Sequence, residues 1–325
     1  MGSTGMRLFR SYLQLPDSLR NSVVVLGNFD GMHRGHQEVI RRGGEIARGL
    51  GGPLTVLTFE PHPRDFFCPQ DIPFRLTTFR IKERQLEALG VDALVVVHFD
   101  ESFRLRSAGD FVSEVLVGSL ATRHVVAGAT FRFGFERTGD MARLAAYGAE
   151  YGFDVTSVDL LADRNGKPLS STRVRNALIG GNPREAASVL GRAWEIEGRV
   201  ELGDRIGRTL DFPTANIHLG EHLRPANGVY AVRAGVDTGL TTVWHDGIAN
   251  FGIRPTVSGT DERLEVHFFD FSQDLYGRHL RVQLIDYLRP EQRFNSIGDL
   301  RVQIGLDVAA ARNVLQQDRG TSLEG

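Results

Sequence analysis

Apolar runs alternate with helix-like segments through the first half of the chain. The runs are short and carry few charges, which is typical of strands buried on both faces of a parallel sheet. They cover Val23–Leu26, Leu54–Phe59, Ala93–Phe99, His124–Ala127 and Asp154–Leu160. Helical spacing between them predicts helices over Gln37–Arg48, Thr78–Leu89, Asp110–Leu120 and Asp140–Tyr151. Strands that alternate with helices predict a doubly wound parallel sheet, which binds ligands at the carboxyl ends of its strands.

The second half of the chain has a different hydrophobic pattern, because polar and apolar residues alternate with a period of two. Strands separated by Gly, Asp and Asn turns predict an antiparallel barrel or sandwich. The expected strands are Glu195–Leu202, Val229–Ala234, Thr241–Ala249, Leu264–Phe269 and Leu280–Tyr287. Gly180–Pro183 breaks the first pattern and a short helix, Arg184–Leu190, follows, so we place a domain boundary near residue 185. Helical spacing over Ile297–Leu315 predicts a terminal helix on the outside of the barrel.

Composition narrows the classes of function. The chain has 325 residues, enough for two domains, and 38 Lys plus Arg against 40 Asp plus Glu. A net charge of −2 gives no basic field for nucleic acid or for an anionic membrane, so small ligands are the expected partners. One cysteine, Cys68, excludes an intramolecular disulfide and a thiolate metal cluster. No apolar run is long enough for a signal peptide or a membrane span, so we expect a cytoplasmic protein of undetermined oligomeric state.

A glycine-rich turn follows the first apolar run. The turn contains Gly27, Asn28, Phe29, Asp30 and Gly31 and leads into the first predicted helix. Its glycines allow close approach to a ligand, and the unpaired N–H groups at the helix start favour phosphate. His33 and His36 lie three apart, so both imidazoles can face one spot and donate hydrogen bonds to a phosphate. The alternative is an ordinary strand-to-helix turn with incidental histidines.

Three further motifs follow other predicted strands of this half. His62 lies between two prolines, which are expected to keep it out of a helix and to hold it toward a ligand, although a rigid turn with an incidental histidine is the simpler interpretation of these residues alone. Phe131 and Phe133 fit an aromatic core loop. Ser171 and Thr172 can cap a helix, while Arg175 adds a fixed cation suited to a triphosphate.

The second half carries its own candidate site in Pro213, Thr214, Ala215 and Asn216. On an extended strand, Thr214 and Asn216 point to the same side and offer hard oxygen ligands for Mg²⁺ on ATP phosphates. A proline-initiated turn with polar capping residues is the alternative. Glu265 lies on a later alternating strand, where an outward polar residue is the plain interpretation.

In their order along the chain, these motifs resemble the bacterial bifunctional riboflavin kinase/FAD synthetase family. The motif sequences are G-N-F-D-G-M-H-R-G-H, F-E-P-H-P, L-S-S-T-R-V-R, P-T-A-N and L-E-V-H. The resemblance implies an α/β domain of Rossmann-like nucleotidylyltransferase type over residues 1–185, and a riboflavin kinase barrel with a terminal helix over 186–325. It implies that ATP phosphorylates riboflavin to FMN and then adenylylates FMN to FAD, both with Mg²⁺.

The resemblance also implies a role for each matched residue. His33 and His36 would neutralise charge on the reacting phosphate, and Glu265 would be the general base of the kinase. ATP in the adenylylation site would contact residues of the glycine-rich turn together with His62, Ser171, Thr172 and Arg175. ATP and Mg²⁺ in the kinase site would contact Arg208, Pro213, Thr214 and Asn216, the last two as metal ligands.

The chain departs from the family pattern at three positions, Thr130, Phe135 and Asp211. The family usually carries Asp or Asn at the first position, a small or basic residue at the second and glycine at the third. Two alternatives therefore stay open. One is a divergent paralogue with one active domain or with a flavin analogue as substrate, and the other is a regulator that binds a flavin or a nucleotide without chemistry.

Overall fold

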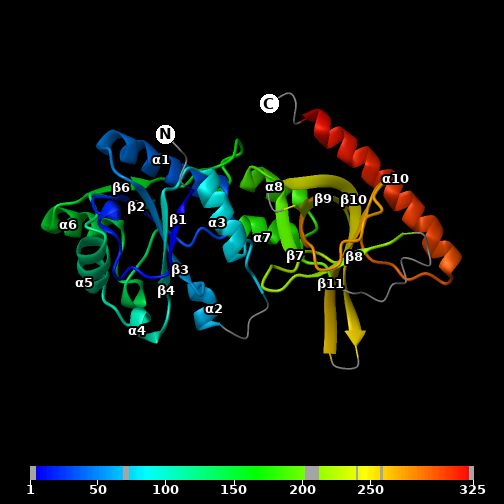
Figure 1. Ribbon diagram of the computed structural model, residues 1–325, viewed down its shortest axis with the longest axis horizontal. Coiled ribbons are helices and arrows are strands. Elements are labelled where there is room, and N and C mark those ends of the chain that lie inside the picture. Colours follow the sequence, from blue (N-terminus) through cyan, green and yellow to red (C-terminus); the bar gives the residue numbers. More distant parts are fainter. Residues whose placement is uncertain (1–4, 69–72, 202–211, 239–240, 257–258, 322–325) are drawn as a thin grey trace. The chain divides into compact units, whose positions relative to one another are not determined.

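The computed structural model describes residues 5–68, 73–201, 212–238, 241–256 and 259–321. Contacts divide them into two compact units (Figure 1). The first unit takes the described residues of 1–72 and 78–170, and the second takes those of 73–77 and 171–325. Helix α7 (Ser171–Ile179) thus belongs to the second unit, and the domain boundary near residue 185 stays a prediction.

The first unit is built on a parallel sheet in the order β1-β4-β3-β2-β5-β6. The strands are β1 (Arg7–Phe9), β2 (Val23–Leu26), β3 (Leu54–Glu60), β4 (Ala93–His98), β5 (His124–Gly128) and β6 (Asp154–Val158). Strands β3 and β4 lie on one side of β2, whereas β5 and β6 lie on the other. The order of successive strands across the sheet therefore reverses at β2, and the carboxyl end of β2 is the place where such sheets bind ligands.

Helices cover both faces of this sheet. Side chains of α1 (Arg34–Leu50) and α3 (Phe79–Ala88) form one core with Val23 and Val25 of β2. On the opposite face, η2 (Phe111–Ser119) and α6 (Met141–Tyr151) pack on Val24 and Leu26. The shorter helices are η1 (Asp17–Leu19), α2 (Pro63–Phe67), α4 (Glu101–Arg104), α5 (Ala108–Asp110) and η3 (Phe135–Arg137). The doubly wound α/β domain is thus confirmed.

Two local predictions differ from the structure. The helix expected over Asp110–Leu120 is an α-helical turn, α5, followed by the π-helical segment η2. Apolar spacing over about two turns cannot separate these helix types, because both place hydrophobic residues on one face. Strand β1 was not anticipated, since its three residues at the sheet edge are too few to show a period.

The second unit is an antiparallel sheet in the order β7-β12-β9-β10-β11-β8. Its strands are β7 (Trp194–Arg199), β8 (Ala215–His218), β9 (Gly228–Asp237), β10 (Thr242–Thr256), β11 (Gly259–Phe268) and β12 (His279–Arg289). The two ends of the sheet come together, because the Glu201 amide just after β7 donates to the Asn216 carbonyl in β8 at 2.9 Å. The sheet thereby curls into the expected barrel.

Helices α8 (Pro183–Leu190) and α10 (Ile297–Thr321) complete the second unit together with α7. Ala311 and Leu315 of α10 are fully buried against Ile248 and Ile285, so the terminal helix packs on the outside of the barrel as predicted. A short segment from the first half of the chain, residues 73–77, also belongs here. The Trp194 indole donates to the Leu76 carbonyl at 2.8 Å.

Candidate active sites

The glycine-rich turn joins β2 to α1 at the point where the sheet order reverses. Phe29 and Met32 adopt left-handed backbone conformations, with φ of 52° and 44°. Both side chains are 1% exposed, so burial in the core compensates for this backbone strain. Two buried apolar side chains, Phe29 and Met32, therefore anchor the turn in the core of the first unit.

The two histidines of this turn lie face to face. His33 is the N-cap of α1, and its Nδ1 accepts a hydrogen bond from the His36 amide at 3.4 Å. The rings stack with centroids 3.7 Å apart and planes 25° from parallel. Phe29 packs on His36 in a T-shaped contact, with ring centroids 5.4 Å apart. The imidazoles share one spot, as their spacing predicts, and their catalytic role stays a prediction.

His62 itself lies outside a helix, as its flanking prolines predict. It is the N-cap of the short helix α2, which begins at Pro63, where a missing N–H costs nothing. The His62 Nδ1 accepts from the Arg64 amide at 3.1 Å. Two residues before it, Glu60 is held by the buried ammonium of Lys82 at 2.9 Å.

A pocket of about 510 Å³ adjoins the turn in the first unit. Its wall includes seven phenylalanines, Phe59, Phe67, Phe99, Phe103, Phe111, Phe131 and Phe133. The rings contact one another in series, for example Phe111 and Phe133 with centroids 5.5 Å apart. Asn28 of the glycine-rich turn and Thr130 also line it. Sequence reasoning missed this pocket, because its rings come from elements far apart in the chain.

Besides Asn28 and Thr130, the polar part of this pocket wall contains four arginines and one acidic residue, namely Arg104, Arg106, Arg132, Arg137 and Glu136. Acidic residues outside the wall hold several of the arginines. Arg104 donates to Glu101 at 2.9 Å, and Arg132 donates to Asp140 at 2.8 Å. The Arg143 amide, and then Arg132, keep the pKa of the Asp140 carboxyl below its usual range, so this anchor is charged at neutral pH. The pocket thus combines aromatic rings, most of them packed tilted or edge to face, with arginines that outnumber its one acidic side chain, which suits an aromatic ligand that carries an anionic group.

The serine-threonine-arginine motif opens α7 in the second unit. Ser171 is the first residue of that helix, followed by Thr172. The Arg175 Nε donates to the Phe74 carbonyl at 2.9 Å, and its guanidinium lies 5.2 Å from the centre of the Phe74 ring. Ser171, Thr172 and Arg175 stay predicted phosphate ligands.

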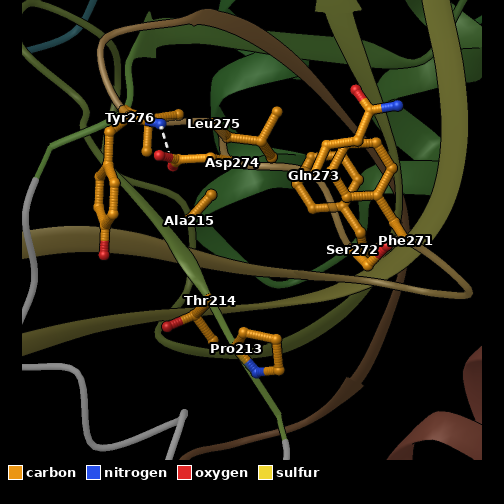
Figure 2. A pocket seen from close by; sticks show the side chains of 11 residues that line it. Pro213, Thr214, Ala215, Phe271, Ser272, Gln273, Asp274, Leu275 and Tyr276 are labelled. Carbon is orange, nitrogen blue, oxygen red and sulfur yellow. Dashed lines mark hydrogen bonds between the residues drawn. The ribbon is translucent and has the colours of Figure 1, made fainter.

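The second unit contains a pocket of about 580 Å³ at the start of β8. Figure 2 shows Pro213, Thr214 and Ala215 with the segment Phe271–Tyr276 arranged around them. The Asp274 carboxylate accepts from the Tyr276 amide at 3.1 Å, which braces this segment. Two predicted kinase residues, Pro213 and Thr214, therefore line one pocket. Arg208 and Asp211 lie outside the described residues.

Asn216 and Glu265 are not in the wall of this pocket but are direct neighbours in the sheet. The register of β8 and β11 pairs them, and the register of β10 and β11 pairs Glu265 with Asn250. Residues paired in this way point to the same face, with Cβ atoms roughly 5 Å apart. One further contact supports this region: the His267 Nδ1 donates to the Pro213 carbonyl at 3.0 Å.

Oxygen atoms are the available metal ligands around Thr214 and Asn216. In the part of the chain that the structure describes, no cluster of three His, Cys, Asp or Glu residues could hold a metal ion. The Thr214 hydroxyl and the Asn216 amide oxygen are hard donors, and the latter residue is 7% exposed. Two such ligands fit Mg²⁺, which commonly takes one or two protein oxygens and completes its shell with phosphate and water.

Comparison with known proteins covers both units. A model of the FAD synthetase family matches residues 15–173, and a model of the riboflavin kinase family matches residues 190–315. The chain is 42% identical over 308 residues to the bifunctional riboflavin kinase/FMN adenylyltransferase of Escherichia coli strain K12, covering 94% of this chain and 97% of that protein. It is 39% identical over 310 residues to the enzyme of that name from Haemophilus influenzae, covering 94% and 98%.

A solved structure shares the fold over almost the whole length. It is that of a macrolide-efflux protein from Streptococcus pneumoniae, with a TM-score of 0.84 and 32% identity over 95% of this chain and 99% of that one. Among the described residues of the present chain, no helix has both the length and the apolar character needed to cross a membrane.

Proposed function

This chain belongs to the bifunctional riboflavin kinase/FMN adenylyltransferase family, and from that membership we infer which residues perform each reaction. The enzyme transfers the γ-phosphate of ATP to riboflavin, which gives FMN and ADP. It then transfers the adenylyl group of a second ATP to FMN, which gives FAD and pyrophosphate. Because ATP serves both reactions, we propose a cytoplasmic location and Mg²⁺ as the companion ion.

Adenylyl transfer is proposed at the glycine-rich turn. A phosphate oxygen of FMN attacks the α-phosphorus of ATP, a new P–O bond forms, and the bond to the pyrophosphate oxygen breaks. No enzyme nucleophile is needed, so positioning and charge neutralisation carry the catalysis. His33 and His36 donate hydrogen bonds to the phosphate oxygens beside the N-terminus of α1. His62, Ser171, Thr172 and Arg175 are the further proposed ATP ligands.

The flavin ring of FMN is proposed to bind in the phenylalanine-lined pocket. The observation that supports this is Asn28, which belongs both to the turn and to the pocket wall. A flavin ring in the pocket can therefore direct its phosphate toward the nucleotide at the turn. Thr130, one of the departures from the family pattern, also lines this pocket and would contact the flavin rather than the reacting phosphate.

Phosphoryl transfer is proposed at the part of the barrel that contains Thr214, Asn216 and Glu265. Glu265 takes the proton from the terminal ribityl hydroxyl, whose oxygen attacks the γ-phosphorus while ADP leaves. Thr214 and Asn216 would hold the Mg²⁺ that accompanies ATP, and that ion supplies charge neutralisation on the phosphates. The register that sets Glu265 directly opposite Asn216 supports this pairing of base and metal ligand.

Gly35→Ala is expected to lower adenylyl transfer about threefold to fivefold, because even a small displacement of a positioned catalytic group raises the barrier. A Cβ at Gly35 would lie 3.0 Å from Nδ1 and 3.1 Å from Cε1 of His33, so the imidazole must shift. The measurement is the rate of FAD formation from FMN and ATP. Gly49→Ala on the same helix, where a Cβ meets no atom within 4 Å, is the matched control. Equal rates for both variants would contradict the role of His33.

Phe99→Ala is expected to raise the KM for FMN about fivefold to tenfold, since one aromatic stacking contact contributes roughly 1 kcal/mol or more. Phe99 packs on Phe59 at 6.1 Å and on Phe103 at 6.0 Å within the pocket wall. Steady-state FAD synthesis at varied FMN checks this, with the exposed Leu160→Ala as control. An unchanged KM would place the flavin elsewhere.

Product analysis tests the proposed function as a whole. Riboflavin incubated with ATP and Mg²⁺ is expected to give FMN and then FAD, separated by chromatography. FMN alone would indicate that only the kinase half is active, as in a divergent paralogue. If neither FMN nor FAD forms, the result would favour a regulator that binds a flavin or a nucleotide without chemistry.

A further inference from the structure

Asn216, Glu265 and Asn250 lie side by side on the neighbouring strands β8, β11 and β10. Glu291, which lies outside the sheet, contacts the last of these three residues. It follows β12 and its carboxylate accepts a hydrogen bond from the Asn250 side-chain amide at 3.0 Å. Since a carboxylate only accepts, this contact fixes which end of the Asn250 amide faces Glu291. The register then places Asn250 directly beside Glu265.

Gly252 provides the space for this contact. Its backbone lies outside the left-handed region, so conformation does not demand glycine at this position. A Cβ there would lie 2.2 Å from Oε1 of Glu291, far inside contact distance. Because that atom is the end of a flexible side chain, any side chain at residue 252 would push Glu291 away without disturbing the barrel backbone.

The chain segment that carries Glu291 is itself anchored. Arg289, two residues earlier, makes two hydrogen bonds to Asp307 of α10 at 2.9 and 2.7 Å. Asp307 is 5% exposed and also accepts from Gln303 at 3.0 Å. An exposed glutamate on an anchored stem loses less conformational entropy when it forms its hydrogen bond. Glu291 can therefore hold Asn250 in one orientation.

We propose that Glu291 is a positioning residue of the kinase reaction, which holds the Asn250 side chain against Glu265 through a contact that only glycine at position 252 permits. The inference rests on the proposed role of Glu265 as the base. Asn250 restricts the rotamers of its cross-strand neighbour, so the Glu265 carboxylate is aimed at the ribityl hydroxyl before the substrate binds. Glu291 does not touch the reacting atoms.

The test compares four variants of the full-length enzyme, Glu291→Ala, Glu291→Gln, Gly252→Ala and the double variant Gly252→Ala/Glu291→Ala. Glu291→Ala is expected to lower the kinase kcat about tenfold with the KM values for riboflavin and ATP within about twofold, as is typical when an orienting partner is removed. Glu291→Gln should recover most of the rate, because its amide oxygen still accepts from Asn250. Adenylylation of supplied FMN should stay unchanged and reports that the protein is folded.

Gly252→Ala should reproduce the loss, and the double variant should be no slower than Glu291→Ala, because both changes remove one contact. The exposed neighbour Gln292→Ala serves as the matched control. Additive losses, an equal loss in Glu291→Gln, a rise in the KM for riboflavin at constant kcat, or no loss at all would each overturn the proposal. If Glu265→Gln keeps full kinase activity, the proposed base fails instead, and the two failures are thereby distinguished.

Discussion

Glu265→Gln is expected to lower the kcat for riboflavin phosphorylation about 10²- to 10⁴-fold, the range that general-base catalysis contributes. Glutamine keeps the size and the hydrogen bonding of the side chain but cannot accept the ribityl proton. Its partners Asn216 and Asn250 stay in register on either side, so no rearrangement of the strand is expected. The measurement is FMN formation from riboflavin under saturating ATP and Mg²⁺.

The second reaction is the internal control for this variant. Conversion of supplied FMN to FAD should proceed at the normal rate, which shows that the protein is folded. Glu150→Gln, an exposed glutamate of α6, is a matched substitution expected to leave both reactions intact. A Glu265→Gln enzyme that phosphorylates riboflavin at the normal rate would assign the base to another residue.

His36→Ala is expected to reduce adenylyl transfer about 10²- to 10³-fold, comparable to the loss of one donor that stabilises charge in a transition state. The mixture should then accumulate FMN when riboflavin is supplied, because the kinase reaction continues. His36 stacks on His33 and makes a T-shaped contact with Phe29, so the loss also removes support for the partner imidazole.

The control for this prediction is His218→Ala, an exposed histidine of β8. It should leave FAD formation from FMN unchanged. His36→Asn restores some polar character at the position and should remain far below the native rate if the imidazole itself is needed. Normal adenylyl transfer in His36→Ala would remove the paired imidazoles from the mechanism.

Periodicity sufficed to predict both sheets, because buried parallel strands and alternating barrel strands leave different patterns. It could not reveal contacts between residues distant in the chain. The segment 73–77, which joins the second unit through Leu76 and Trp194, is one example. The closure of the barrel through the Glu201 and Asn216 backbones is another.

The sites were predictable to different extents. Motif spacing predicted that His33 and His36 would lie together, since both belong to one helical turn. It could not predict the pocket to which Phe59, Phe103 and Phe133 contribute, because each ring arrives on a different element. Glu291 gave no signal in the sequence either, since its contact with Asn250 spans 41 residues.

A crystal structure with a non-hydrolysable ATP analogue, Mg²⁺ and FMN tests the central claim most directly, namely that the enzyme binds one nucleotide at the glycine-rich turn and another at Thr214 and Asn216 of the barrel. The account predicts one triphosphate at the glycine-rich turn within hydrogen-bond distance of His33 and His36, with the flavin ring among the phenylalanines. It predicts a second triphosphate whose Mg²⁺ is bound by Thr214 and Asn216, next to Glu265. Triphosphates bound away from the paired imidazoles or from Thr214 and Asn216 would contradict it.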